Sequence, residues 1–231
     1  MRIIGSLLRS LEARALLILM VVAGGVWAFV ELADEVLAGE TQSLDERILL
    51  ALRNPNDLAD PIGPPWIEEI CRDITALGGV AVLTLACFAI AGLLWLDGKR
   101  LWSGLVVAAM GGGVLMGVVL KSVFDRPRPD LVPHGSQVAT NSFPSGHSMM
   151  AAVAYLTAAA LLCRLYDRKR LKAYLIAWAL LLTLAVGFSR VYLGVHWPTD
   201  VLGGWTLGAV WALLCWWVAG MLAQTKATDS R

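Results

Sequence analysis

The chain has 231 residues, of which 58% are hydrophobic and 16% are charged. Soluble domains carry about 25% charged residues, so this composition excludes a water-soluble globule, a disordered chain, a collagen and a disulfide-bonded scaffold. It favours a protein that crosses a membrane several times. Because a spanning helix takes about 20 residues, the length allows about six spans with their loops.

Six apolar stretches follow one another along the chain, and each is long enough to cross the hydrocarbon core. They are residues 15–32, 74–96, 101–120, 148–165, 171–188 and 201–222. None has a charge near its middle, where a charged side chain costs about 2.5–3.5 kcal/mol on insertion scales. In lipid, backbone groups find partners only in their own chain, so every span should be a helix. The sequence therefore predicts an all-α, polytopic membrane protein with one domain, residues 1–231, built as a single bundle of six transmembrane helices.

The first apolar stretch has a second interpretation. Arg9 and Arg14 precede it and small residues lie near Ala38, as in a cleaved signal peptide. The apolar run continues to Leu32 and no small-residue cleavage site directly follows it, so we expect the span to be retained. Either alternative leaves the orientation of the other five spans unchanged.

Basic residues are unevenly distributed between the two sides of the predicted bundle. Twelve of the 19 Lys and Arg residues lie at the termini, between spans two and three, and between spans four and five. The terminal ones are Arg2, Arg9, Arg14, Lys226 and Arg231. The segment from Glu31 to Asp73, which contains the long loop between the first two spans, has 11 acidic residues and three arginines. Because Lys and Arg are enriched in cytoplasmic loops, we expect both termini in the cytoplasm and the long loop outside.

The outer loop, residues 33–73, contains a short amphipathic stretch at residues 44–53. Its apolar residues, Leu44, Ile48, Leu49 and Leu52, share one face at helical spacing. Two roles fit such a helix: an interfacial helix that packs on the bundle, which we favour, and a gate for substrate.

Outside the long loop, the outer polar residues are concentrated in two connections within residues 121–200. All three histidines of the chain lie there. One connection follows the third span and ends at Pro144-Ser145-Gly146-His147, and the other joins spans five and six. Ionisable residues are costly in membrane proteins and mark functional sites.

The cations in these connections fit a phosphate group. Lys121, Arg128 and Arg190 converge if the ends of spans three and five meet. Ser145 and Gly146 stand where a helix begins, and free N–H groups at a helix N-terminus bind anions. Three cations and a helix N-terminus suit the several oxygens of a phosphate, whereas a carboxylate needs fewer donors.

Two histidines supply the chemistry for such a site. Asp200 follows His196 by four residues, which brings the carboxylate within reach of the imidazole if the first turn is helical. A carboxylate on Nδ1–H leaves Nε2 free as a nucleophile. His147 is then available as a general acid for the leaving oxygen.

Other interpretations of the same residues have to be weighed. A single histidine at a membrane surface is commonly only solvated, and an arginine near a span end commonly snorkels. A zinc site from His147, His196 and Asp200 is disfavoured because three neighbouring cations would repel the metal. Arg126 is an additional cation whose simplest role is pairing with Asp125.

The spacing of these residues resembles the signature of the type 2 phosphatidic acid phosphatase family, whose soluble relatives include vanadium haloperoxidases and bacterial acid phosphatases. The pattern is Lys-x6-Arg-Pro, then Pro-Ser-Gly-His, then Ser-Arg-x5-His-x3-Asp. All eleven positions are present: Lys121, Arg128, Pro129, Pro144, Ser145, Gly146, His147, Ser189, Arg190, His196 and Asp200. The pattern covers about a third of the chain and matches nothing in the first two spans or the outer loop.

The resemblance implies a metal-independent phosphatase without a cofactor. By this resemblance His196 attacks phosphorus and forms a phosphohistidine, Asp200 orients it, and His147 protonates the leaving group. Lys121, Arg128, Ser145, Gly146 and Arg190 would hold the phosphoryl oxygens.

The position of these residues at the outer interface implies a membrane lipid as substrate, and the expected partners are that lipid and the bilayer, with no nucleic acid. Polyprenyl diphosphate ranks first, followed by phosphatidylglycerol phosphate, phosphatidic acid and a lipid A phosphate. We expect a multi-pass protein of a bacterial inner membrane with its site facing the periplasm or the outside. A lipid phosphotransferase using the same phosphoenzyme is the alternative. A transporter fits less well, because transport sites lie near the bilayer midplane on broken helices.

Overall fold

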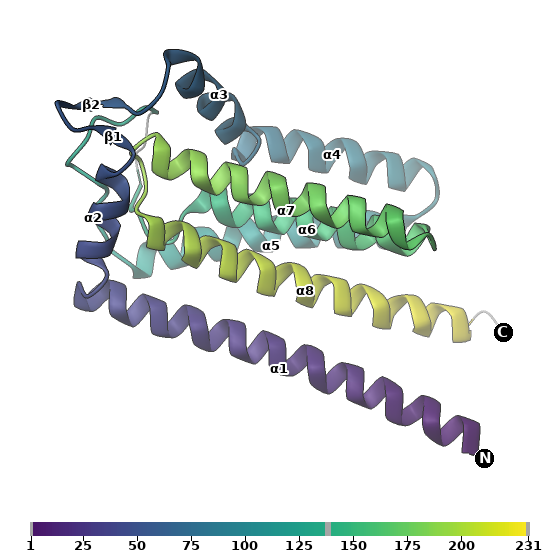
Figure 1. The fold of residues 1–231 in the computed structure, drawn as a ribbon. Coiled ribbons are helices and arrows are strands. Elements are labelled where there is room, and N and C mark those ends of the chain that lie inside the picture. Colours follow the sequence, from purple (N-terminus) through teal and green to yellow (C-terminus); the bar gives the residue numbers. More distant parts are fainter. Residues whose placement is uncertain (1, 137–139, 230–231) are drawn as a thin grey trace.

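Long apolar segments form long helices, and short polar segments between them form a cap at one end of the bundle (Figure 1). The computed structural model describes residues 2–136 and 140–229. Its helices are α1 (Arg2–Ala38), α2 (Gln42–Leu50), α3 (Pro65–Ala76), α4 (Val80–Leu96), α5 (Arg100–Val123), α6 (Gly146–Leu165), α7 (Lys169–Tyr192) and α8 (Pro198–Asp229). A two-stranded hairpin, β1 (Arg53–Asn54) and β2 (Asp57–Pro61), completes the cap.

Five helices (α1, α5, α6, α7 and α8) are long and apolar enough to cross a membrane. The second predicted span, residues 74–96, is not one continuous helix: it belongs to the pair α3 and α4, which is bent by 46° at the break between them. Gly78 and Gly79 lie at this break. A Cβ at Gly78 would come within 2.5 Å of Val186 Cγ1 and 2.9 Å of the His147 carbonyl oxygen, so only glycine allows this approach. The apolar sequence predicted the span, but not the bend.

The bundle is built around α6, which packs against α5, α7 and α8. Residues 149–153 of α6 are almost fully buried. Small residues of the neighbouring helices permit this packing: a Cβ at Gly117 of α5 would lie 2.8 Å from Met149, and one at Gly208 of α8 would lie 2.6 Å from the Ala152 Cβ. Close helix contacts at glycine are common in membrane bundles.

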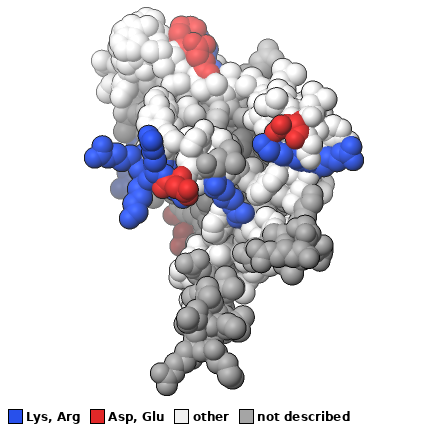
Figure 2. All heavy atoms as spheres, turned by 90° about the vertical axis from the view of Figure 1, so that its right-hand side faces the viewer, with Lys and Arg blue, Asp and Glu red and all other residues white. Residues whose placement is uncertain are grey.

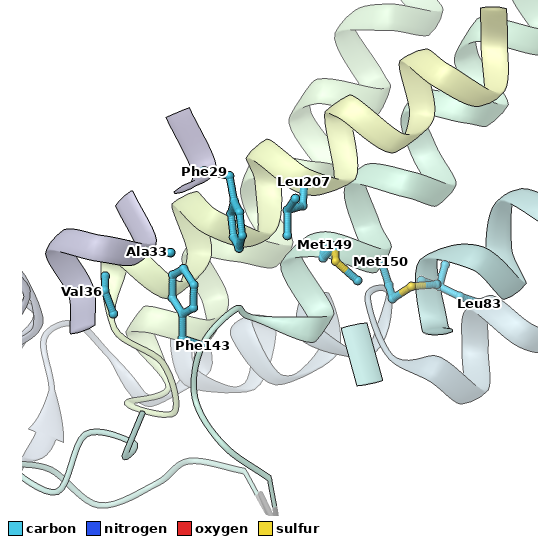
Figure 3. Packing of buried hydrophobic residues seen from close by; sticks show 8 residues of the cluster. All are labelled: Phe29, Ala33, Val36, Leu83, Phe143, Met149, Met150 and Leu207. Atoms are coloured by element: carbon cyan, nitrogen blue, oxygen red, sulfur yellow. The ribbon is translucent and has the colours of Figure 1, made fainter. Parts of the chain in front are cut away.

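A cluster of buried hydrophobic residues that includes the rings of Phe29 and Phe143 packs inside the bundle (Figure 3). Phe143, directly before the Pro-Ser-Gly-His segment, stacks on Phe29 of α1 at 5.6 Å between ring centroids. Phe124, after α5, meets the Phe143 ring edge-on at 5.2 Å. Phe143 is fully buried, so its ring fixes the chain where it enters α6.

The cap consists of α2, the hairpin and α3. In the hairpin, Arg53 pairs with Pro61 and Asn54 with Asp57. Leu49 of α2 is fully buried against the bundle, whereas Leu44 and Ile48 remain 47% and 40% exposed. The apolar face expected for this segment is therefore only partly buried, because the helix turns Asp45 and Leu49 inward.

Both chain ends lie at the opposite end of the bundle from the cap (Figure 1). Figure 2 views this opposite end, where basic side chains gather around a few acidic ones. The exposed basic residues of the two connections at this end are Lys99, Arg100, Arg168, Lys169 and Arg170. The terminal residues Arg2, Arg9, Arg14, Lys226 and Arg231 lie outside the part of the chain whose side chains are described.

Candidate active site

His196 and Asp200 face each other where the loop after α7 enters α8. The His196 Nδ1 lies 3.2 Å from Asp200 Oδ2, and both side chains are buried. The same carboxylate oxygen accepts the Trp197 N–H at 2.9 Å and a short hydrogen bond from the Ser142 hydroxyl. With Nδ1–H donating to Asp200, Nε2 carries the free lone pair.

The guanidinium of Arg128 lies next to His196 Nε2. Its Nη1 is 3.1 Å from His196 Nε2 and 2.5 Å from the Val195 carbonyl oxygen, while Nε donates to the Thr140 carbonyl oxygen at 2.7 Å. An always-protonated guanidinium donates to Nε2 only if that nitrogen is unprotonated. The contact therefore assigns the neutral tautomer with its proton on Nδ1.

Lys121 reaches the same loop from the end of α5. Its Nζ donates to the Asn141 carbonyl oxygen at 2.8 Å and to Thr140 Oγ1 at 3.0 Å. Arg128 and Lys121 thus share Thr140 as a neighbour. Backbone oxygens hold both cations, Lys121 through Asn141 and Arg128 through Thr140 and Val195.

The Pro-Ser-Gly-His segment forms the N-terminus of α6. The Ser145 N–H donates to the Asp200 carbonyl oxygen at 2.9 Å, which ties this terminus to the start of α8. The Ser145 side chain makes no capping hydrogen bond to the first backbone N–H groups of α6. A Cβ at Gly146 would lie 3.6 Å from Lys121 Cε, which places the lysine stem beside this terminus. A helix N-terminus beside a lysine is the arrangement expected of an anion site.

His147 lies in the first turn of α6, beside the break between α3 and α4. A Cβ at Gly79 would lie 3.8 Å from His147 Nε2, within ordinary contact distance. The bend in the second span therefore borders the predicted general acid. No sequence signal assigned this role to Gly78 and Gly79.

Arg190, in the last turn of α7, is buried. Its Nη1 donates to Thr75 Oγ1 of α3 at 2.9 Å and lies 3.4 Å from Ser136 Oγ. Its Nε has no partner among the described residues. A buried guanidinium N–H without a partner is costly, and a phosphoryl oxygen could satisfy it.

Arg126 is bound differently from the prediction. It does not pair with Asp125; instead Nη1 lies 2.6 Å from Asp200 Oδ1 and Nη2 lies 2.7 Å from Asp45 Oδ2. Residues 124–130 are irregular, and Asp125 is exposed where Arg126 is buried, because neighbouring side chains of an extended segment point to opposite sides. Sequence reasoning missed Asp45 and Ser142 as well.

Burial dominates the electrostatics of His196. It lowers the pKa of this imidazole to about 3, an effect that the hydrogen bond to Asp200 opposes and that Arg128 and Arg190 reinforce. Burial also lowers the pKa of Arg128, while Asp200 raises it. His196 is therefore neutral at physiological pH, as a nucleophile must be.

The zinc arrangement considered for His147, His196 and Asp200 is not found. Within residues 2–136 and 140–229, no group of three or more His, Cys, Asp or Glu side chains is placed to hold a metal ion. The cations Arg126 and Arg128 contact the two groups, Asp200 and His196, that would have been ligands.

Comparison with known proteins gives consistent results. The model of the PAP2 superfamily matches residues 100–223. Phosphatidylglycerophosphatase B of Bacillus subtilis is 38% identical over 186 residues, which cover 78% of this chain and 85% of that protein. The putative undecaprenyl-diphosphatase YbjG of Escherichia coli is 31% identical over 164 residues, 67% of this chain and 75% of its own.

A solved structure also matches. The crystal structure of a transmembrane PAP2 type phosphatidylglycerolphosphate phosphatase from Bacillus subtilis has a TM-score of 0.75 to this chain. It is 34% identical, and the match covers 84% of this chain and 93% of that one. The range matched by the family model, residues 100–223, contains all eight residues predicted for the site.

Proposed function

We propose, on the premise that this chain belongs to the PAP2 superfamily, that it is a membrane lipid phosphatase that works through a phosphohistidine on His196. The observation that carries the mechanism is the pair of contacts of the His196 ring. Nδ1 lies 3.2 Å from Asp200 Oδ2 and Nε2 lies 3.1 Å from Arg128 Nη1. A phosphoryl group bound by Arg128 therefore meets the nitrogen that carries the lone pair.

In the first half-reaction, the Nε2 lone pair attacks phosphorus and the bond from phosphorus to the leaving oxygen breaks. Protonated His147 gives its proton to that oxygen, so a lipid alcohol or a lipid phosphate departs. The ring of His196 keeps Nδ1–H and becomes a phosphoimidazolium cation. Asp200 compensates this charge. Lys121, Arg128, Arg190, the Ser145 hydroxyl and the Gly146 N–H bind the phosphoryl oxygens.

In the second half-reaction, water replaces the lipid. Neutral His147 accepts a proton from the water as its oxygen attacks phosphorus, and the bond between phosphorus and Nε2 breaks. Inorganic phosphate leaves and His196 returns to its neutral form. The proton that His147 donated is restored, so the cycle consumes only lipid phosphate and water.

The position of the site supports a lipid substrate on the outer side of a bacterial inner membrane. The site lies at one end of the spans, at the level of the cap, where lipid headgroups would lie beside a bundle of this kind (Figure 1). The opposite end has the exposed basic residues and both termini, which supports a cytoplasmic assignment for that end (Figure 2). A lipid can thus keep its tail in the bilayer while its phosphate enters the site.

Two substrate classes stand first. Polyprenyl diphosphate is the first choice from the sequence, and the 31% identical relative is a putative undecaprenyl-diphosphatase. Phosphatidylglycerol phosphate stands beside it, because the 38% identical relative is named for that reaction. Phosphatidic acid and a lipid A phosphate remain further members of the substrate panel.

The experiment is phosphate release by the purified full-length protein from these four lipids, compared by kcat/KM. We expect one lipid to exceed the others and activity to survive EDTA. Release from none of them would contradict the proposal, and activity lost in EDTA and restored by zinc would contradict its mechanism. Transfer of phosphate to an added lipid in preference to water would identify a phosphotransferase instead.

A further inference from the structure

A buried charge network lies behind the nucleophile and reaches into the outer cap. Arg126 bridges two carboxylates, Asp200 of α8 and Asp45 of α2, at 2.6 and 2.7 Å. Arg126 is 7% exposed and both carboxylates are 0% exposed. The guanidinium also lies 5.7 Å from the centroid of the Trp197 ring, which is itself buried. Neither water nor salt screens these charges effectively.

Asp45 is also tied to the start of α8. Its Oδ1 accepts the Thr199 N–H at 2.9 Å, and its Oδ2 accepts the Thr199 hydroxyl at 2.6 Å. Arg126 Nη1 donates to Thr199 Oγ1 at 2.8 Å as well. The carboxylate of Asp45 thus contacts the residue next to Asp200, although it lies in the outer loop and outside the sequence range matched by the family model.

The charges of this network balance only during the reaction. Before phosphoryl transfer, two carboxylates, one guanidinium and a neutral His196 sum to −1. When His196 becomes a phosphoimidazolium cation, the sum becomes zero. Without the charge of Asp45, Arg126 would already neutralise Asp200, and the new cation would stay uncompensated in a buried site.

We propose that Asp45 is a positioning residue that neutralises Arg126, so that the negative charge of Asp200 remains available to stabilise the phosphoimidazolium form of His196. This inference rests on the proposed phosphohistidine mechanism and adds a residue of the outer cap to it. Asp45 touches neither substrate nor His196. It acts through Arg126 and through the first turn of α8.

The test uses Asp45→Asn, with Glu46→Gln as its matched control. Glu46 is the next residue of α2, and among the described residues its carboxylate accepts a hydrogen bond from Gln42 alone, so the same change from acid to amide leaves the network intact. We expect Asp45→Asn to lower kcat by about ten- to a hundredfold with KM changed less than about threefold, because the loss concerns a charge formed during the reaction. Glu46→Gln should behave as wild type.

The double variant Asp45→Asn/Arg126→Gln distinguishes charge from structure. Removing both partners restores the balance between Asp200 and the phosphoimidazolium, so its kcat should exceed that of Asp45→Asn by about fivefold or more. A purely structural role for Asp45 predicts the opposite, since the double variant loses more contacts than the single one.

Rapid quenching with a lipid labelled on its terminal phosphate supplies a second readout. Asp45→Asn should accumulate less phosphoenzyme than wild type, because its phosphoimidazolium forms more slowly and breaks down faster. Wild-type kcat and phosphoenzyme in Asp45→Asn, or a double variant less active than the single one, would overturn the inference. If Asp45→Asn does not fold, the double variant decides alone: kcat within about tenfold of wild type supports the inference, and a larger loss overturns it. Absence of phosphoenzyme in the active wild-type protein would instead overturn the proposed mechanism.

Discussion

The chain divides into two regions that contribute to the site in different ways. Residues 100–223, the range matched by the family model, contain every group proposed to touch the phosphate. Residues 2–99 contain none of these groups. Their buried polar contacts to the site region include those of Asp45 with Arg126, Arg53 with the Tyr192 carbonyl oxygen, and Thr75 with Arg190. All groups of the proposed reaction thus lie in one region, and the other contributes buried contacts to them.

The two regions should respond differently to mutation. Changes in the reacting region should remove catalysis, whereas changes in the supporting region should weaken individual steps or stability.

The largest effect is expected for His196→Ala. Removing the nucleophile should lower kcat by about 10⁴-fold or more, as for other groups that act as one catalytic unit. His134→Ala is the control, since His134 lies in the connection between α5 and α6 and, among the described residues, its ring is hydrogen-bonded to the Pro129 carbonyl oxygen alone. Phosphate release by His196→Ala at more than about a hundredth of the wild-type rate would remove the distinction between the two regions.

His147→Gln should lower kcat by about 10²- to 10⁴-fold, the usual contribution of a general acid. The loss should be greater for phosphatidic acid than for polyprenyl diphosphate, because an alkoxide needs a proton more than a leaving phosphate does. The measurement compares kcat of wild type and variant on both lipids. Equal losses on the two would contradict the assignment of His147 as the acid for the leaving group.

Stability should fall in mild acid because of His196. Its pKa in the folded protein is about 3, against about 6.5 for an unperturbed histidine. Between these pH values the unfolded chain binds a proton that the folded chain does not, so unfolding becomes easier as pH falls. On going from pH 7 to pH 5 this effect amounts to about 2 kcal/mol.

Thermal unfolding of wild type and His196→Gln at the two pH values measures this term. The variant should lose less stability than wild type on acidification. The same pH dependence in both proteins would show that His196 is not the group responsible.

The smallest effect is expected in the supporting region. Thr75→Val keeps the shape of the side chain but removes the hydroxyl that fixes Arg190, so KM should rise by about three- to tenfold while kcat changes less. Thr206→Val is the matched control, because the Thr206 hydroxyl donates to the Leu202 carbonyl oxygen of its own helix. A kcat loss as large as that of His147→Gln would mean that α3 takes part in the chemistry.

The sequence allowed prediction of the fold wherever structure depends on local apolar length. Six spans were expected, and five helices and one bent pair are long and apolar enough to form them. The bend itself could not be predicted, because it depends on the close approach of Gly78 to Val186 and His147, which are remote in sequence.

In the site, too, a contact between residues close in sequence could be predicted, and a contact between distant segments could not. The contact between His196 and Asp200 follows from helical spacing, and the structure has it. The partner of Arg126 could not be found in this way, since Asp45 lies 81 residues away in a loop without a motif. Adjacency suggested Asp125 instead, and the alternation of an extended segment turns that side chain outward. Buried ion pairs between distant segments require the tertiary structure.

The central claim is that phosphate is carried by His196, and trapping the intermediate tests it most directly. Full-length protein is quenched in base during turnover of the preferred lipid, and the labelled peptide is mapped by mass spectrometry. We expect a base-stable, acid-labile phosphate on His196 that is absent from His196→Ala and present in His134→Ala. A phosphate on Ser145 or another residue, or turnover without any phosphoenzyme, would contradict it.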